Sequence, residues 1–147
     1  MSELKRILLV EDSEQDVELT LAALAEHRLA NEVVVARDGI EALEYLNRQG
    51  PFGLRAPGLP AVVLLDLTMP RMDGLEVLRR LKGSPELKAL PVVMLTSSRE
   101  ERDLVESYAL GVNAYVVKPV DFSQFVDVVK EIGMFWAVIN QPPPGSA

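Results

Sequence analysis

The chain has 147 residues, of which 48% are hydrophobic and 25% charged, and this is long and apolar enough for one domain with its own core. The absence of cysteine excludes disulfides, thiol catalysis and metal sites that use thiolate ligands. The net charge of −7 argues against nucleic acid as a partner, because phosphate contacts require a basic surface.

Five short apolar runs are spaced along the chain, and we expect each to be a strand. The first is too short for a signal peptide, and no run approaches the ~18 residues of a membrane span. We therefore expect a cytoplasmic protein without a membrane partner. The runs lack polar alternation, which predicts strands buried on both faces. They cover residues 7–10, 33–36, 61–66, 91–95 and 114–117.

Amphipathic segments separate these runs and predict helices. Ser13 is typical of an N-cap, and Val17 should lie on the core face of the helix that follows. Two helices are expected near residues 104–109 and 121–139, and the segment 49–60, with three Gly and three Pro, predicts a long surface loop. The core positions expected in the second and third helices are Ile40, Leu43, Leu46, Leu75, Leu78 and Leu81.

Strands and helices alternate along the whole sequence, and this order defines the fold class. Alternation with strands of uniformly apolar character predicts a parallel sheet with helices on both faces. Right-handed crossovers leave few topologies, of which a doubly wound α/β sheet of five strands and five helices is the simplest. We expect one domain over residues 1–140, followed by a Pro-rich tail over residues 141–147.

Four of the five predicted strands end at a polar or charged side chain. These residues are Glu11-Asp12, Asp66, Thr96 and Lys118. In doubly wound sheets the ligand lies outside the carboxyl ends of the strands, so these side chains should meet there. Each by itself would be ordinary loop chemistry, but the combination indicates a single site.

The charges of this group indicate what it binds. Three clustered carboxylates must protonate or find a cation, and a divalent ion together with Lys118 would neutralise them. Oxygen ligands suit Mg²⁺, which keeps several waters and binds phosphate. Asp66 is then the candidate nucleophile toward a phosphoryl group, since carboxylates form acyl phosphates. Lys118 and the Thr96 hydroxyl would hold the phosphoryl oxygens.

This ordered pattern resembles the receiver domain of two-component response regulators. It comprises Glu11-Asp12, Asp66, Met69-Pro70, Asp73-Gly74, Thr96 and Lys118-Pro119, within a match over residues of about 5 to 132. The resemblance implies a flavodoxin-like sheet in the order 2-1-3-4-5, and transfer of a phosphoryl group to Asp66 from a phosphohistidine of a sensor histidine kinase. It also implies that Asp12, Asp66 and the Thr68 backbone carbonyl bind Mg²⁺, with Glu11 acting through water.

The resemblance assigns further roles. Thr96 and Tyr115 would form a switch pair, and the peptide bond between Lys118 and Pro119 would be cis. Such a protein would catalyse only its own phosphorylation and dephosphorylation, and would signal through protein contacts.

Some features of this chain narrow the resemblance. Thr68 and Ser98 occupy positions at which the family tunes the lifetime of the phosphorylated state. The long loop 49–60, the Phe135-Trp136 pair and the Pro-rich end are similar to stand-alone regulators that are paired with bacterial phytochromes. A bacterial phytochrome is therefore the expected type of kinase partner.

The last predicted helix carries more apolar surface than one face of a sheet can cover. An uncovered apolar stripe usually lies in a contact, and response regulators often dimerise through this part of the domain. We therefore expect a homodimer; the alternative is that the Pro-rich tail covers the stripe. The residues expected in the interface are Tyr108, Tyr115, Val128, Phe135 and Trp136.

Three other functions are compatible with parts of this pattern. A phosphatase of the haloacid dehalogenase type needs a second aspartate two residues after the nucleophile, and here that residue is Thr68. A flavodoxin-like cofactor protein needs a phosphate-binding loop after its first strand. Here the acidic segment 11–14 occupies that position and would repel a phosphate group. A receiver-like binding module that is never phosphorylated is the third alternative, and reaction with acetyl phosphate would distinguish it.

Overall fold

The structure is a computed structural model, and its description covers part of the chain. The described residues are 6–26, 32–54, 58–67, 69, 72–96, 109, 111–112 and 114–117. The predicted domain boundary at residue 140, the tail, and the last helix lie outside them, as does all but one residue of the helix expected at 104–109.

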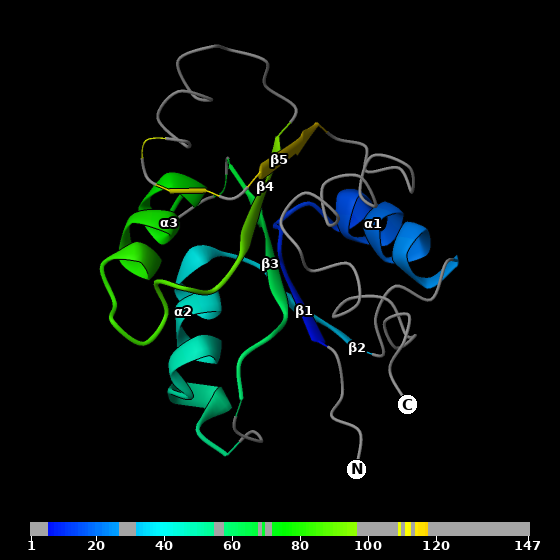
Figure 1. Cartoon of the computed structure of the whole chain (residues 1–147). Helices are drawn as coiled ribbons and strands as arrows, with labels where there is room; N and C mark the ends of the chain where they lie inside the picture. The colour runs from blue at the N-terminus through cyan, green and yellow to red at the C-terminus, as the bar shows by residue number, and fades with distance from the viewer. Residues whose placement is uncertain are drawn as a thin grey trace, which may run out of the picture.

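Five parallel strands form one sheet in the order β2-β1-β3-β4-β5 (Figure 1). This order confirms the predicted doubly wound, flavodoxin-like topology. The strand bounds agree with the sequence prediction to within one residue at either end. They are β1 (Arg6–Val10), β2 (Glu32–Ala36), β3 (Val62–Asp66), β4 (Val92–Thr96) and β5 (Ala114–Val117).

The strand register brings the carboxyl ends of the strands to one edge of the sheet. Val10 at the end of β1 pairs with Ala36 of β2 on one side and with Leu65 of β3 on the other. Asp66 at the end of β3 lies opposite Leu95 of β4. The residues that follow these strands must therefore start from neighbouring points, which is the condition for a shared site.

In the described part of the chain, three α-helices cover the sheet, with α1 (Glu14–Glu26) on one face and α2 (Gly39–Asn47) and α3 (Gly74–Lys82) on the other (Figure 1). Each begins just after a side chain that caps it. The oxygens of Ser13, Asp38 and Asp73 accept hydrogen bonds from the backbone N–H three residues later, at 3.3, 2.9 and 2.9 Å. The predicted N-cap at Ser13 is confirmed, and the caps start all three helices at the site edge of the sheet.

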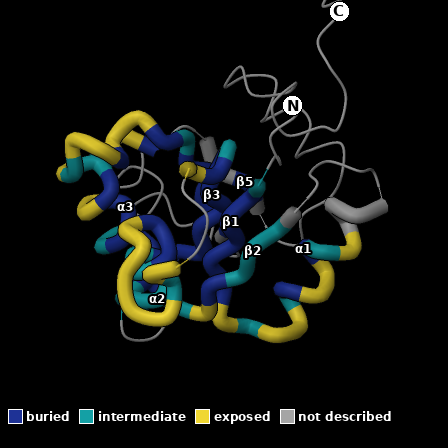
Figure 2. The backbone as a smooth tube through the Cα atoms, turned by 90° about the horizontal axis from the view of Figure 1, so that it is seen from below, coloured by how far each residue is buried: buried dark blue, intermediate teal, exposed yellow. Residues whose placement is uncertain are grey.

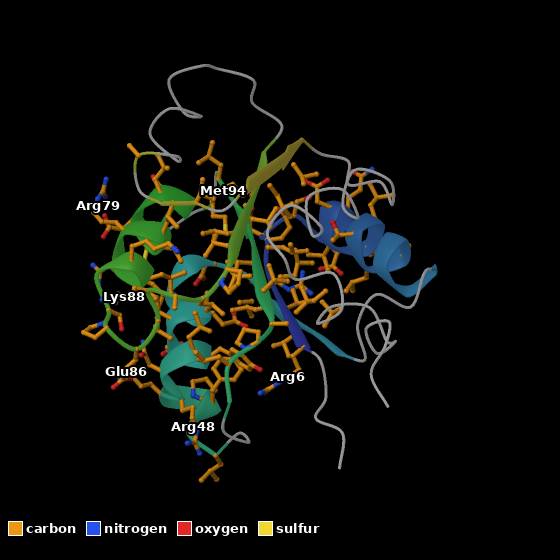
Figure 3. All side chains as sticks on the ribbon, in the orientation of Figure 1. Arg6, Arg48, Arg79, Glu86, Lys88 and Met94 are labelled. Carbon is orange, nitrogen blue, oxygen red and sulfur yellow. The ribbon has the colours of Figure 1, made fainter. Side chains whose placement is uncertain are left out.

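The core lies between the sheet and its helices, with residues 7–10 of β1 and the whole of β3 buried (Figure 2). All five residues of β3 are buried, and Met94 of β4 lies in the layer against α2 and α3. The charged residues Arg79, Glu86 and Lys88 lie on the outside of the same layer (Figure 3). None of the helices in the described part of the chain is long and apolar enough to cross a membrane.

Three details differ from the sequence prediction. Residues 33–35 of β2 are only half-buried, because β2 is an edge strand. The buried positions of α2 include Ala42 and Tyr45 as well as the predicted Leu46, whereas Ile40 and Leu43 are partly exposed. The expected loop 49–60 contains a short 3-10 helix, η1 (Gly50–Phe52).

The additional burial in α2 is explained by an aromatic contact across this loop. The rings of Tyr45 and Phe52 meet edge to face, with centroids 5.3 Å apart, and the Arg6 guanidinium donates a hydrogen bond to the Tyr45 hydroxyl at 3.1 Å. These contacts attach η1 to the amino-terminal end of the sheet, at the opposite end from the site.

Candidate functional site

Glu11 occupies the first position after β1, at the edge of the sheet. Its backbone N–H donates to the Ala36 carbonyl at 2.9 Å, so the pairing of β1 with β2 continues one residue beyond the strand. The residue is only 1% exposed, and its Oε1 accepts a hydrogen bond from the Ser13 N–H at 3.2 Å. The N-terminal end of α1 therefore stabilises a buried carboxylate at a fixed place.

Asp12 lies on the exposed side of the same turn. The chain reverses there, because the Ser13 hydroxyl caps α1 and the helix begins at Glu14. Asp12 is exposed while Glu11 beside it is buried. The Asp12 carboxylate thus lies on the solvent side of the site, and the Glu11 carboxylate lies on its interior side.

Asp66 is the last residue of β3 and is 4% exposed. The Leu67 N–H donates to the Leu95 carbonyl at 2.9 Å, and the Gly74 N–H donates to the Leu67 carbonyl at 2.9 Å. These bonds close the loop between β3 and α3 back onto the strand end. Asp66 therefore leaves a buried strand with its backbone fixed on both sides.

The structure brings the three carboxylates together. One ligand oxygen from each of Glu11, Asp12 and Asp66 lies within 4.8 Å of the others, and we call this group the acidic cluster. Three carboxylates at this spacing repel each other unless a cation or proton compensates them. The donor set consists of oxygen only, with one member open to solvent, and this fits a hard divalent ion such as Mg²⁺ that keeps some of its waters.

The remaining predicted site residues are described only in part. The backbone of Thr96 ends β4 opposite Val117, and Tyr115 lies in β5 opposite Met94, which puts the two residues in neighbouring strands. Their roles stay predictions. The other predicted residues lie outside the described part of the chain; they are Thr68, Tyr108, Lys118, Pro119, Val128, Phe135 and Trp136.

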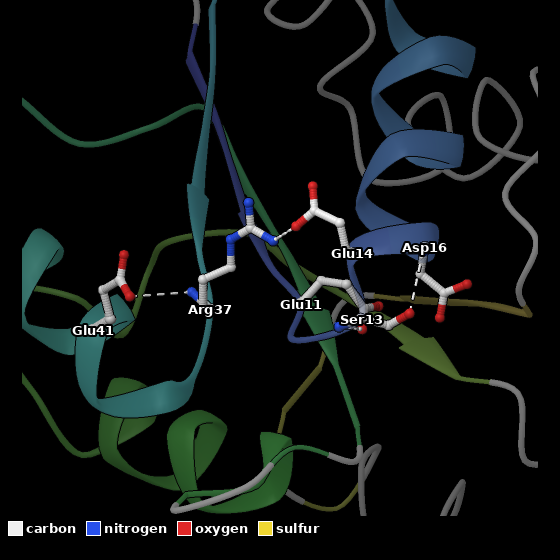
Figure 4. A network of polar contacts seen from close by, with 6 residues as sticks. All are labelled: Glu11, Ser13, Glu14, Asp16, Arg37 and Glu41. Atoms are coloured by element: carbon white, nitrogen blue, oxygen red, sulfur yellow. Dashed lines mark hydrogen bonds and ion pairs between the residues drawn. The ribbon is translucent and has the colours of Figure 1, made fainter.

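Sequence reasoning missed one contact at this edge. Arg37, the first residue after β2, forms an ion pair with Glu14 in the first turn of α1 (Figure 4). The sequence contains a signal for Arg37, because it is the first residue after β2, just as Glu11 is the first residue after β1. It was overlooked because Arg37 and Glu14 are 23 residues apart, and only the fold brings them together.

Comparison with known proteins agrees with the fold. The family model of the response regulator receiver domain matches residues 7–130. Response regulator Rcp1 from Synechocystis sp. is 41% identical over 132 residues, which cover 90% of this chain and 88% of Rcp1. A solved structure of Rcp1 is of its Mn²⁺-bound form; it is 40% identical, covers 95% of this chain and 99% of that chain, and has a TM-score of 0.74.

Two other solved structures are similar over most of their length. The bacteriophytochrome response regulator AtBRR is 63% identical, with coverage of 95% of this chain and 100% of that chain and a TM-score of 0.87. The phosphorylated cyanobacterial phytochrome response regulator RcpA is 43% identical, with coverage of 91% and 94% and a TM-score of 0.75. The family match and these identities lead to one conclusion: the chain belongs to the response regulator receiver domain family.

Proposed function

We propose that this protein is a response regulator in which Asp66 accepts a phosphoryl group from a phosphohistidine of a sensor histidine kinase. The observation that carries the proposal is the acidic cluster, in which the buried Asp66 lies with Glu11 and Asp12 within 4.8 Å. A carboxylate nucleophile beside two further carboxylates is the arrangement that metal-assisted phosphoryl transfer to aspartate requires.

The proposed reaction needs only water as a source of one proton besides the two proteins. An Asp66 carboxylate oxygen bonds to phosphorus, the bond from phosphorus to the histidine nitrogen breaks, and the departing imidazole takes up a proton. Glu11, Asp12, Asp66 and the Thr68 carbonyl are the residues that would hold Mg²⁺, which supplies charge neutralisation for the phosphoryl oxygens when bound. Lys118 and Thr96 are proposed to contact the same oxygens.

The names of the relatives suggest the kinase. AtBRR is described as a bacteriophytochrome response regulator and RcpA as a phytochrome response regulator. Because AtBRR is 63% identical to this chain, we propose a bacterial phytochrome as the kinase partner. The phosphatase alternative has no support, since Thr68 stands where its second aspartate is needed.

The direct test is chemical. The protein is incubated with Mg²⁺ and acetyl phosphate, and in parallel with a phosphorylated phytochrome kinase, and the modified residue is mapped by mass spectrometry after borohydride reduction of the acyl phosphate. We expect the label on Asp66. A protein that takes no label from either donor would instead be a receiver-like binding module.

Magnesium should stabilise the folded protein, because the acidic cluster exists only in the folded chain. At about ten times the dissociation constant of Mg²⁺ the expected gain is about 1.4 kcal/mol. This corresponds to a rise in Tm of about 4 °C for a domain of this size. Thermal melts with and without millimolar MgCl₂ measure it.

Two variants make the magnesium test specific. Asp12→Ala removes one carboxylate of the cluster and should abolish the rise in Tm. Glu86→Ala removes an exposed carboxylate at the outside of the α2–α3 layer and should leave the rise unchanged (Figure 3). A wild-type protein whose Tm does not respond to Mg²⁺ would contradict the metal site.

We also propose that the protein forms a homodimer through the last helix. The support is in the sequence, where the last helix carries a second apolar stripe, which includes Phe135, beside the stripe of Trp136 that is expected against the sheet. The two stripes together exceed what the sheet can cover. Replacing both by Ala removes the largest side chains of the expected interface and should give a monomer at tens of micromolar in sedimentation velocity. Leu19→Ala, which removes a half-exposed apolar side chain on α1, should remain dimeric. A monomeric wild type would end the idea.

A further inference from the structure

The Arg37–Glu14 pair joins two loops at the edge of the sheet where the acidic cluster lies. Arg37 follows Ala36, whose carbonyl accepts the hydrogen bond of the Glu11 N–H. Its guanidinium extends from the end of β2 to the Glu14 carboxylate in the first turn of α1 (Figure 4). The pair therefore lies beside the segment that supplies two of the three clustered carboxylates.

The backbone of Arg37 is held by a hydrogen bond to the start of α2. Its backbone N–H donates to Oε2 of Glu41 at 3.4 Å, and the Glu41 N–H donates to the Asp38 side chain that caps α2. The guanidinium thus projects from an anchored position. Its partner Glu14 is held by the start of α1, directly after the Ser13 cap.

The pair is a poor candidate for a purely stabilising contact. The side chains of Arg37 and Glu14 are 46% and 66% exposed, and ion pairs with this exposure contribute little to folding. Charge balance is a better explanation of what the pair does. The segment 11–16 carries four carboxylates, at Glu11, Asp12, Glu14 and Asp16. Glu14 and Asp16 are outside the acidic cluster, and Arg37 neutralises Glu14, the nearer of the two in sequence.

We propose that Arg37 is a charge-balancing residue of the phosphorylation site, which acts by compensating Glu14. It thereby sets the affinity of the acidic cluster for divalent cations and the rate at which anionic phosphodonors reach Asp66. This inference rests on the proposed function, because it assumes that the cluster binds a cation and that Asp66 is phosphorylated.

The sign of the effect separates this role from a structural one. Arg37→Gln leaves Glu14 uncompensated, which makes the edge more negative, strengthens Mg²⁺ binding and repels a dianionic donor. Glu14→Gln leaves Arg37 uncompensated and acts in the opposite direction on both quantities. Both variants break the same pair, so a structural role predicts changes of the same sign.

The experiment measures two quantities for each variant. The Mg²⁺ dissociation constant comes from the dependence of Tm on MgCl₂ concentration, without any phosphodonor. The rate of Asp66 phosphorylation by acetyl phosphate is measured at low salt and again at about 1 M salt, where the Debye length is about 3 Å. One unit charge screened by water should change each quantity about threefold at low salt, and the effect on the rate should be much smaller at high salt.

Three further variants serve as controls. Arg37→Lys keeps the charge and should behave as wild type, and the double variant Arg37→Gln/Glu14→Gln restores charge balance and should return both quantities close to wild type. Arg80→Gln removes another exposed arginine, paired with Glu76 on α3, and should leave both unchanged. It controls for the loss of one charge from the whole molecule.

The outcomes are distinct. Opposite shifts in the two single variants, reversed in the double variant, support the inference. Shifts of the same sign, or no shift while the wild type binds Mg²⁺ and is phosphorylated, overturn it. A wild type that neither responds to Mg²⁺ nor takes phosphate on Asp66 contradicts the proposed function itself, on which the inference depends.

Discussion

Replacement of Asp66 by Asn should abolish phosphorylation while leaving the fold intact. The amide lacks the anionic oxygen that attacks phosphorus, so incorporation from acetyl phosphate or from the kinase should fall below detection. Asn has nearly the same shape, and Asp66 is 4% exposed in a cluster of like charges. Without Mg²⁺, removal of one of these charges should therefore raise the free energy of unfolding by about 1 kcal/mol.

The measurement combines intact-mass spectrometry after incubation with the phosphodonor and a thermal melt without metal. Asp38→Asn is the matched control, because it makes the same change at the same edge of the sheet. Asn caps helices as well as Asp does, so that variant should keep both its fold and its phosphorylation. Full labelling of the Asp66→Asn protein would show that another residue is the phosphoacceptor.

Replacement of Gly74 by Ala should destabilise the protein strongly, because the added methyl group has no room beside the site. A Cβ at Gly74 would lie 2.3 Å from the Asp66 carbonyl oxygen and 2.9 Å from the Leu67 Cα. Both are backbone atoms of the strand end, so the clash cannot be relieved by a side-chain rotation. We expect a loss of about 3 kcal/mol in unfolding free energy. Tm should fall by about 10 °C.

The same clash must displace Asp66 or the start of α3, so the remaining folded protein should also bind Mg²⁺ more weakly. Gly53→Ala is the control, because Gly53 has φ −60° and its added Cβ meets nothing closer than 3.5 Å. That change should leave stability unchanged or raise it by about 0.5 kcal/mol. Equal melting temperatures for the two variants would contradict the close approach at Gly74.

The strands and the edge that carries the site could be predicted from the residue pattern, and the strand order from the resemblance to receiver domains. Uninterrupted apolar runs such as residues 62–65 predict strands of a parallel sheet, and alternation with helices admits few parallel topologies. The local turn chemistry was equally informative, since the predicted cap at Ser13 depends only on a residue three positions away. Patterns confined to a few neighbouring residues are determined by the sequence itself.

The prediction failed where burial depends on distant partners. Nothing within α2 shows that Tyr45 is buried, because its partner Arg6 comes from strand β1 and its partner Phe52 from a segment expected to be an irregular loop. The half-exposure of residues 33–35 follows from the edge position of β2, which is a property of the whole sheet.

The site divides in the same way. The sequence by itself determined which residues follow the strands, and hence that Glu11, Asp12 and Asp66 face one edge with the charge that calls for a divalent cation. Only the tertiary structure decided that their oxygens lie within 4.8 Å and that Arg37 forms an ion pair with Glu14. Strand ends are marked by local residue patterns, whereas distances between side chains depend on register and helix packing, which are set by contacts across the whole chain.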